Sequence, residues 1–479
     1  MQADELYNLA MKILSDKYES QDVELKAASA GCPTRLFDTL SSFSNQDQGG
    51  IIVFGIEESK GYKIGGVYDP QDLQKKVAEQ CKQMEPQVRA LFTVCEIEGK
   101  FIVSAEIPGV DVSSRPVFYK GVGRIKGSYI RVGESDEQMS EYEVYSYEVY
   151  RKRIRDDMRV VENGRVDLFD RKRLDEYLGA VKRERRNLSE NVPDNDILEL
   201  MGVTIHGEPT LAGVMAFSLY PQTYFPQLCI TAVVVPGLRM GDTGDAGERF
   251  IDNRRITGAV PDMLKEAVEF VLKNSRTQTV VGADGMRHDK EEYPAIAVRE
   301  AVLNALLHRD YSVYTENTPI RIEMYRDRIE IINSGGLYGK ISINSLGRVR
   351  PETRNAALAN ILELLKIAEN RYSGIPTIRN ECRDAGMEEP EFSSKHGEFK
   401  VVFRSRIYRD GTQIKNSCDA ADIIEFCRTP RSRDELTEFT GKSRYYTMSA
   451  LIAPLIEQGK LKMTLPDKPK SSKQRYVKA

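Results

Sequence analysis

The sequence predicts a multidomain protein of the α+β class. With 479 residues the chain is too long for one hydrophobic core, and its length suggests three or four domains. Apolar residues at helical spacing and short strand-like runs both occur in most regions of the chain. The hydrophobic fraction of 41% is enough for several cores, and the charged fraction of 29% is ordinary for a soluble protein. We therefore expect several α+β units in series.

Net charge and apolar runs exclude some classes of protein. The formal net charge of -3 gives no argument for nucleic-acid binding, which has to rest on local basic patches. No apolar run approaches the roughly 20 residues that span a bilayer, and the first residues do not look like a signal peptide. We expect a cytoplasmic protein without membrane contact. The seven cysteines and four histidines lack ligand spacing, so any metal should be held by oxygen.

Residues 1–145 are expected to form the first domain. Apolar residues at helical spacing predict a helix over 35–45, and glycines at 49 and 50 lead from it into a buried strand. More strands are predicted at 101–108, 117–120 and 128–133. This domain is therefore α+β.

The same domain carries three carboxylates that are candidates for a metal site and for catalysis. Glu19 and Glu24 lie on or near one strand, and Glu58 follows another. Carboxylates from neighbouring strands can hold a divalent cation that polarises a phosphodiester and its attacking water. Lys26 would share a strand face with Glu24 and neutralise developing charge. The alternative is that these carboxylates are solvated or salt-bridged residues at strand ends.

The order of motifs in this domain resembles the Schlafen-type AlbA domain. The resemblance rests on Val-Glu-Leu-Lys at 23–26, Phe-Ser-Asn at 43–45, Gly-Gly-x-x-x-x-Gly-Ile-Glu-Glu at 49–58 and Gly-Gly-Val at 65–67. It implies a nucleic-acid-binding domain. In animal relatives three carboxylates form an RNase centre, which maps here to Glu19, Glu24 and Glu58, whereas bacterial relatives are described as DNA-binding modules.

A basic strand edge is expected to support nucleic-acid binding by this domain. Such an edge can combine phosphate contacts with stacking of bases on aromatic rings. The alternative is a solvated edge protected by its charge. The residues are Lys120, Arg124, Lys126 and Arg131, interleaved with Tyr119 and Tyr129.

Two regions without assigned chemistry follow. Residues 146–196 are strongly charged and are expected to form a helical connector. Residues 197–290 predict an α+β middle region, with strands at 211–220 and 228–236 and an amphipathic helix over 259–274.

The apolar run at 299–311 contains a carboxylate, an amide and an imidazole, each four residues after the one before. Glu300, Asn304 and His308 therefore share one face of a helix. An unpaired buried polar group costs on the order of 1 to 3 kcal/mol, so a ligand or a polar partner is expected on that face. A carboxylate that orients water and an amide oxygen that helps hold magnesium suit nucleotide hydrolysis. The alternative is a satisfied polar seam between packed elements.

The run at 299–311 resembles the first ATP-binding box of the Bergerat-fold (GHKL) ATPases, in the branch found in bacterial transcriptional regulators. A strand ending in glycines at 327–337, then Arg354-Asn355 and Tyr-Ser-Gly-Ile at 372–375, resemble the later boxes. The resemblance implies a Bergerat-type α/β sandwich over 291–406 with ATP and Mg²⁺ as cofactors. Glu300 would activate water for a weak ATPase and Asn304 would bind Mg²⁺. The nucleotide pocket would be lined by Asn333, Gly335, Gly336, Ser373 and Gly374.

This chain departs from the Bergerat boxes at two positions. The second box normally carries an aspartate that contacts the adenine amine, and here the residue is Asn333. The late box usually begins with glycine, and here it begins with Tyr372. ATP binding is therefore better supported than turnover.

Residues 415–479 are expected to form a winged helix-turn-helix. Three short helices are followed by a strand and a basic loop, and Ser432 with Glu435 has the form of a capping box. A basic third helix and wing would contact nucleic acid. The alternative is a winged helix used for protein contact. The candidate nucleic-acid residues are Lys442, Arg444, Lys468, Lys470, Lys473 and Arg475.

Two functions remain open from the sequence. The first is a regulator in which ATP binding controls contact with DNA or RNA, as a homodimer or higher homo-oligomer. The second is a metal-dependent Schlafen-like nuclease effector that cuts RNA or DNA, for example in defence against phage.

Overall fold

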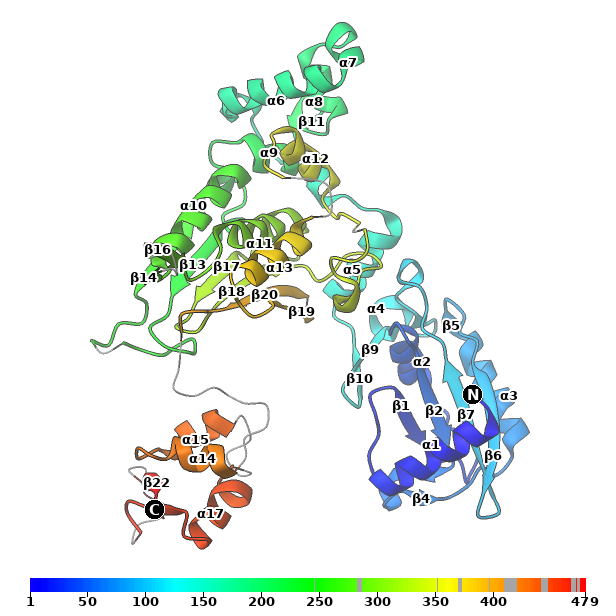
Figure 1. Ribbon diagram of the computed structural model, residues 1–479. Coiled ribbons are helices and arrows are strands. Elements are labelled where there is room, and N and C mark those ends of the chain that lie inside the picture. The colour runs from blue at the N-terminus through cyan, green and yellow to red at the C-terminus, as the bar shows by residue number, and fades with distance from the viewer. Residues whose placement is uncertain are drawn as a thin grey trace. The chain divides into compact units, whose positions relative to one another are not determined.

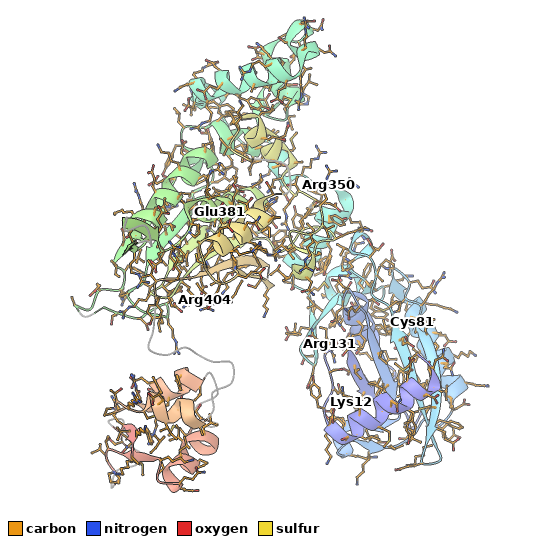
Figure 2. The ribbon with its side chains drawn as sticks, viewed as in Figure 1. Lys12, Cys81, Arg131, Arg350, Glu381 and Arg404 are labelled. Atoms are coloured by element: carbon orange, nitrogen blue, oxygen red, sulfur yellow. The ribbon has the colours of Figure 1, made fainter. Side chains whose placement is uncertain are left out.

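The computed structural model divides the chain into two compact units. It describes residues 1–244, 246–281, 287–350, 352–368, 373–395, 397–408, 420–440, 447–466, 471 and 474–479. The first unit comprises Met1–Ser275 and Tyr293–Arg404, and the second Arg276–Glu292 and Ser405–Ala479 (Figures 1 and 2). Within the described ranges, no helix is both long and apolar enough to cross a bilayer.

The N-terminal domain is built on a mixed sheet with strand order β1-β2-β7-β6. Strand β1 pairs in parallel with β2, and the other pairings are antiparallel. One face is covered by α1, whose Leu6, Ala10 and Ile13 are buried at helical spacing. The other face packs on α2 and α3. The main bounds are α1 (Ala3–Asp16), β1 (Val23–Lys26), α2 (Phe37–Ser44), β2 (Gly50–Phe54), α3 (Pro70–Lys82), β6 (Leu91–Ile97) and β7 (Lys100–Ile107).

Shorter elements complete this domain. Helix α4 occupies residues that were expected to form part of a strand edge. Arg124 and Lys126 therefore lie on a helix, while Arg131 remains on a strand. These elements are β3 (Ile56–Glu57), β4 (Lys63–Ile64), β5 (Met84–Glu85), β8 (Phe118–Tyr119), α4 (Gly123–Gly127), β9 (Tyr129–Val132) and β10 (Ser135–Gln138).

The expected connector is helical. Helix α5 opens with a capping box between Ser140 and Glu143, and Asp170 caps α6 through the backbone N–H of Arg173. The helices of this segment are α5 (Glu141–Lys152), α6 (Arg171–Glu184), α7 (Arg186–Asn191) and α8 (Asp194–Leu200).

The run at 211–220 forms a helix, α9 (Leu211–Phe217), where a strand was expected. All seven of its residues are buried. A short apolar run that is buried on every side has no periodicity to separate helix from strand. The helix is started by Thr210, whose side chain accepts a hydrogen bond from the backbone N–H of Gly213.

A six-stranded sheet unites the middle region with the ATPase-like region. Its order is β14-β13-β17-β18-β20-β19, and β13 pairs in parallel with β17. Residues 197–290 were expected as a separate unit, but β13 and β14 belong to this sheet, and α10 shares one core with α11. The sequence did not reveal this long-range pairing. The strands are β13 (Ile230–Val234), β14 (Asp252–Ile256), β17 (Ile320–Met324), β18 (Arg328–Ser334), β19 (Glu391–Lys395) and β20 (Glu398–Arg404).

Four helices accompany this sheet. Helix α11 packs against α10, α13 and β18, and α12 packs against α9 (Figure 1). The N-terminus of α12 is capped by a residue far away in sequence, because the carboxylate of Asp157 accepts hydrogen bonds from the backbone N–H groups of Ala357 and Leu358. The helices are α10 (Val260–Asn274), α11 (Ala295–His308), α12 (Ala356–Leu364) and α13 (Gly374–Asp384).

The second unit contains a hairpin of β15 (Thr277–Val281) and β16 (Arg287–Glu291) and a small C-terminal module. The predicted capping box is confirmed, since the backbone N–H of Ser432 donates to Glu435 (2.7 Å) and that of Glu435 donates to Ser432 Oγ (3.2 Å). The module comprises α14 (Ala420–Phe426), α15 (Arg433–Thr440), the π-helical turn η7 (Thr447–Ile452), α17 (Ala453–Glu457), β21 (Leu461–Met463) and β22 (Tyr476–Lys478).

Candidate functional site

The predicted polar face lies on α11. Seven residues of this helix are buried in the core, whereas Glu300, Asn304 and His308 are only partly buried. Glu300 pairs with the neighbouring Arg299 at 2.8 Å. Burial, together with the positive charge of Arg354, lowers the pKa of His308 to about 4, so this imidazole is neutral at physiological pH. The face therefore presents one carboxylate, one amide and one neutral ring.

The N-terminus of α13 meets this face. A Cβ atom built on Gly374 would lie 3.1 Å from Asn304 Nδ2 and 3.4 Å from Glu300 Oε2. Ser373 precedes Gly374 as the N-cap residue, and its carbonyl accepts the first helical hydrogen bond from Thr377. The first and third predicted boxes are thus brought together at a helix N-terminus, which favours a negatively charged ligand.

The amide of Asn304 is incompletely satisfied. Its Nδ2 atom is buried and has no hydrogen-bond partner within the described residues. A buried donor of this kind costs on the order of 1 to 3 kcal/mol, which a bound ligand would recover. The amide oxygen of Asn304 is a ligand type that Mg²⁺ accepts. Glu300, Asn304 and the α13 N-terminus therefore fit a magnesium nucleotide.

The second predicted box lies at the opposite end of α11. Asn333 is buried at the end of β18, and its Nδ2 donates to the carbonyl of Ser334. Gly335 has a φ of 100°, and a Cβ there would lie 2.8 Å from the backbone nitrogen of Asp310. Gly336 follows it, and a Cβ added to Gly336 would lie 3.0 Å from Ser394 Oγ. Only glycine fits comfortably at Gly335.

Two residues beside this box were missed as site residues from the sequence. Asp310 and Arg354 form a buried ion pair with Nη1 and Oδ2 2.6 Å apart, and their side chains are 1% and 5% exposed. Arg354 also donates to the carbonyl of Gly336, and Tyr142 of α5 donates its hydroxyl to Asp310 (2.9 Å). Asp310 lies in the run at 299–311 and Arg354 lies in the Arg354-Asn355 motif, but their distance in the sequence gives no sign that they form a pair.

The three N-terminal carboxylates share one neighbourhood. Burial, with the negative charges of Glu24 and Glu58, raises the pKa of Glu19 to about 7. Glu24 is held by Lys26 (2.5 Å) and by Arg131 (2.8 Å), while Glu58 is exposed. Among the described residues no three Asp, Glu, His or Cys side chains converge to hold a metal ion. The carboxylates therefore do not form a ready-made metal centre, although Glu19 titrates near neutrality.

The expected basic strand edge is only partly exposed. Arg131 has a side chain 1% exposed, bound to Glu24 and Asp136, because an alternating strand points it into the domain. Arg124 pairs with Glu148, and Tyr119 stacks on Phe37. Lys120 and Lys126 remain exposed.

Most candidate residues of the C-terminal module fall outside the described part of the chain. This applies to Lys442, Arg444, Lys468, Lys470 and Lys473, and to Tyr372 of the late box. Arg475 is described: it is partly buried beside β22, and its Nη1 donates to the carbonyl of Gln474.

The raised pKa of Glu19 predicts a pH-dependent stability. The folded domain keeps the Glu19 proton up to about pH 7, whereas an unfolded glutamate loses it near pH 4.5. Stability should therefore fall by up to about 3 kcal/mol as pH rises between these values, and level off above them. Denaturant unfolding of Glu19→Gln should lack this fall. The exposed Glu79→Gln should retain it, and equal pH dependence in both variants would contradict the prediction.

Two family models match parts of this chain. Residues 19–140 match the family described as "Schlafen, AlbA_2", and residues 317–403 match the family described as "Putative ATP-dependent DNA helicase recG C-terminal". No curated protein matches the chain.

Two solved structures are similar to parts or all of the chain. The crystal structure of the DIP2311 protein from Corynebacterium diphtheriae is 17% identical and covers 94% of this chain and 92% of its own, with a TM-score of 0.41. The solution structure of the N-terminal domain of a RecG-related protein from Nitrosomonas europaea is 28% identical and covers 27% of this chain and 92% of its own, with a TM-score of 0.23. The two family matches show that this chain carries a region similar to the Schlafen AlbA_2 family and, further along, a region similar to the recG C-terminal family.

Proposed function

We propose that the protein is an ATP-binding, nucleic-acid-binding regulator, in which bound ATP controls contact with DNA or RNA. The observation that carries the proposal is the buried, unpartnered Nδ2 of Asn304 facing Gly374 at the start of α13. The N-terminal amides of α13 would receive the phosphates, Asn304 would hold Mg²⁺, and Glu300 would orient water. Bound Mg²⁺ supplies charge neutralisation for the phosphates.

Helix α5 supports coupling between the two domains. It begins at Glu141, directly after the AlbA-type region, and its Tyr142 donates to Asp310. The backbone N–H of Asp310 donates in turn to Ser334, next to Gly335. A change at the nucleotide site can thus reach α5 through two hydrogen bonds. Regulation requires that the nucleic-acid-binding states differ in ATP affinity.

The test is nucleic-acid affinity with and without ATP. Fluorescence anisotropy of labelled single-stranded RNA, single-stranded DNA and duplex DNA should show a change in Kd of about tenfold when Mg²⁺ and saturating ATP are added. Asn304→Ala should remove the change. Asn380→Ala is the matched control, because Asn380 is exposed on α13. The proposal would be contradicted if ATP changed neither the nucleic-acid affinity nor the homo-oligomeric mass measured by light scattering.

The pKa of Glu19 favours a second candidate function, cleavage of nucleic acid at Glu19, Glu24 and Glu58. A carboxyl group that titrates near neutrality suits general acid–base catalysis. Glu58→Gln is the sharpest variant, because Glu58 is exposed whereas Glu24 is tied to Arg131. Cleavage of an RNA and DNA panel, with divalent metal and with chelator, should then be lost in Glu58→Gln and kept in Glu79→Gln. No cleavage by the unaltered chain under any condition would eliminate this candidate.

A further inference from the structure

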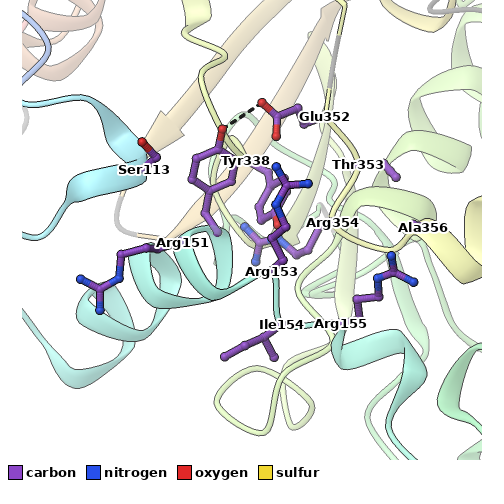
Figure 3. A pocket seen from close by; sticks show the side chains of 11 residues that line it. Ser113, Arg151, Arg153, Ile154, Arg155, Tyr338, Glu352, Thr353, Arg354 and Ala356 are labelled. Carbon is purple, nitrogen blue, oxygen red and sulfur yellow. Dashed lines mark hydrogen bonds between the residues drawn. The ribbon is translucent and has the colours of Figure 1, made fainter.

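A pocket lined by arginines lies between the end of α5 and the segment before α12. Its volume is about 390 Å³, which is within the usual size of small-molecule sites. Four arginines line it against one carboxylate, that of Glu352 (Figure 3). The arginines are Arg151, Arg153, Arg155 and Arg354.

Two of these arginines are not neutralised by the protein. Arg354 is paired with Asp310, and Arg151 contacts Glu148 at 3.5 Å and points away from the other arginines in Figure 3. Within the described ranges, the side chains of Arg153 and Arg155 make no hydrogen bond or ion pair, and both residues are exposed. The carboxylate of Glu352 already accepts a hydrogen bond from Tyr150 (2.9 Å), drawn as the dashed line. The pocket therefore has an excess of positive charge.

Buried polar atoms at the pocket also lack partners. Thr353 Oγ1 and Arg354 Nε are both buried without a hydrogen-bond partner in the described part of the chain. Arg354 is 5% exposed, so its guanidinium is held in place rather than free to turn to solvent. A hydroxyl and a fixed guanidinium N–H, both covered by protein atoms, thus lie beside two arginines with unpaired side chains, and all of these are donors that suit an oxyanion.

We propose that this pocket binds a small phosphorylated ligand, of the nucleoside phosphate class, at a site separate from Asn304. The phosphates contact Arg153 and Arg155 and, once its side chain turns toward the pocket, Thr353, and the Tyr150 and Tyr338 rings line the space for the remainder of the ligand. These two rings form an edge-to-face pair with centroids 5.4 Å apart, which fixes one wall. Because α5 also carries Tyr142, a ligand here acts on the helix that leads to Asp310.

The first test uses inorganic pyrophosphate as the probe and the full chain. Isothermal titration should show binding, weakened by about tenfold or more in the double variant Arg153→Gln, Arg155→Gln. The matched control is Arg171→Gln, Arg183→Gln, which removes the same charge from exposed positions on α6 and should leave the affinity unchanged. Equal affinity in both double variants would overturn the proposal.

A second variant separates binding from folding. Thr353→Val removes a hydroxyl that has no described partner, so stability should be unchanged or higher while pyrophosphate affinity falls. A loss of stability with unchanged affinity would mean that the hydroxyl is structural, and would count against the site.

ATP titrations distinguish this site from the proposed nucleotide site. The arginine double variant should still bind ATP with Mg²⁺, and Asn304→Ala should still bind pyrophosphate at the arginine pocket. Loss of both ligands in both variants would show that the pocket belongs to the ATP site and would overturn the proposal. An oligonucleotide that binds through Arg153 and Arg155 when pyrophosphate does not would also overturn it, in favour of a nucleic-acid contact.

Discussion

Replacement of Asp310 by alanine should lower the free energy of unfolding by about 3 to 5 kcal/mol. Asp310 is 1% exposed and accepts hydrogen bonds from Tyr142 and from the backbone N–H of Ser312, in addition to its pair with Arg354. Its loss leaves the guanidinium of Arg354 buried without a counter-charge. That uncompensated charge, more than the lost contacts, sets the size of the effect.

A control variant and hydrogen exchange show whether the loss of stability arises at Asp310. Asp167→Ala removes a carboxylate of an exposed pair with Arg165 and should cost less than about 1 kcal/mol. Because a multidomain chain need not unfold in one step, hydrogen exchange of peptides from α11 should accompany the denaturant curves. Protection should fall in α11 and remain in β1 and β2. An Asp310→Ala variant as stable as Asp167→Ala would contradict the expected role of the ion pair.

The substitution Gly374→Ala should reduce ATP affinity by about tenfold or more without destabilising the fold. The added Cβ would lie 3.1 Å from Asn304 Nδ2 and would fill the space beside Glu300. Gly374 is in a helix and does not have a positive φ, so alanine is not strained by the backbone there. The Asn304 side chain has to shift slightly to admit the methyl group, so stability should change little, while binding falls.

A glycine elsewhere provides the control for this experiment. Gly179 lies inside α6 with only the flexible Arg183 near an added Cβ, at 3.4 Å. Gly179→Ala should stabilise the protein by about 0.5 to 1 kcal/mol and leave ATP affinity unchanged. Thermal unfolding measures the change in stability of both variants, and ATP titration measures the change in their ATP affinity. Unchanged ATP affinity in Gly374→Ala would place the nucleotide elsewhere.

Local spacing predicted the centre of the candidate site. Glu300 and Asn304 share a helix face as their spacing requires. Gly374, which only the family resemblance linked to them, lies against them. The capping box at Ser432 was also predictable, because both of its partners lie within one turn. These features depend on neighbours in sequence or on a short motif.

Features that depend on tertiary pairing were not predictable from one sequence. The parallel pairing of β13 with β17 merges two expected domains, and the pair of Asp310 with Arg354 joins distant segments. Arg131 looked like a surface residue because its neighbours are basic and aromatic, but its strand face points inward to Glu24. Helix α9 was mistaken for a strand because its apolar run has no period.

The most direct measurement is ATP binding by the 479-residue chain in the presence of Mg²⁺. In the Arg153→Gln, Arg155→Gln background, which removes the second proposed phosphate site, isothermal titration should give one ATP per chain with and without Asn380→Ala, and affinity at least about tenfold weaker with Asn304→Ala. This result would place the nucleotide between α11 and α13. Equal affinity in all three proteins, or no binding in any of them, would contradict the account.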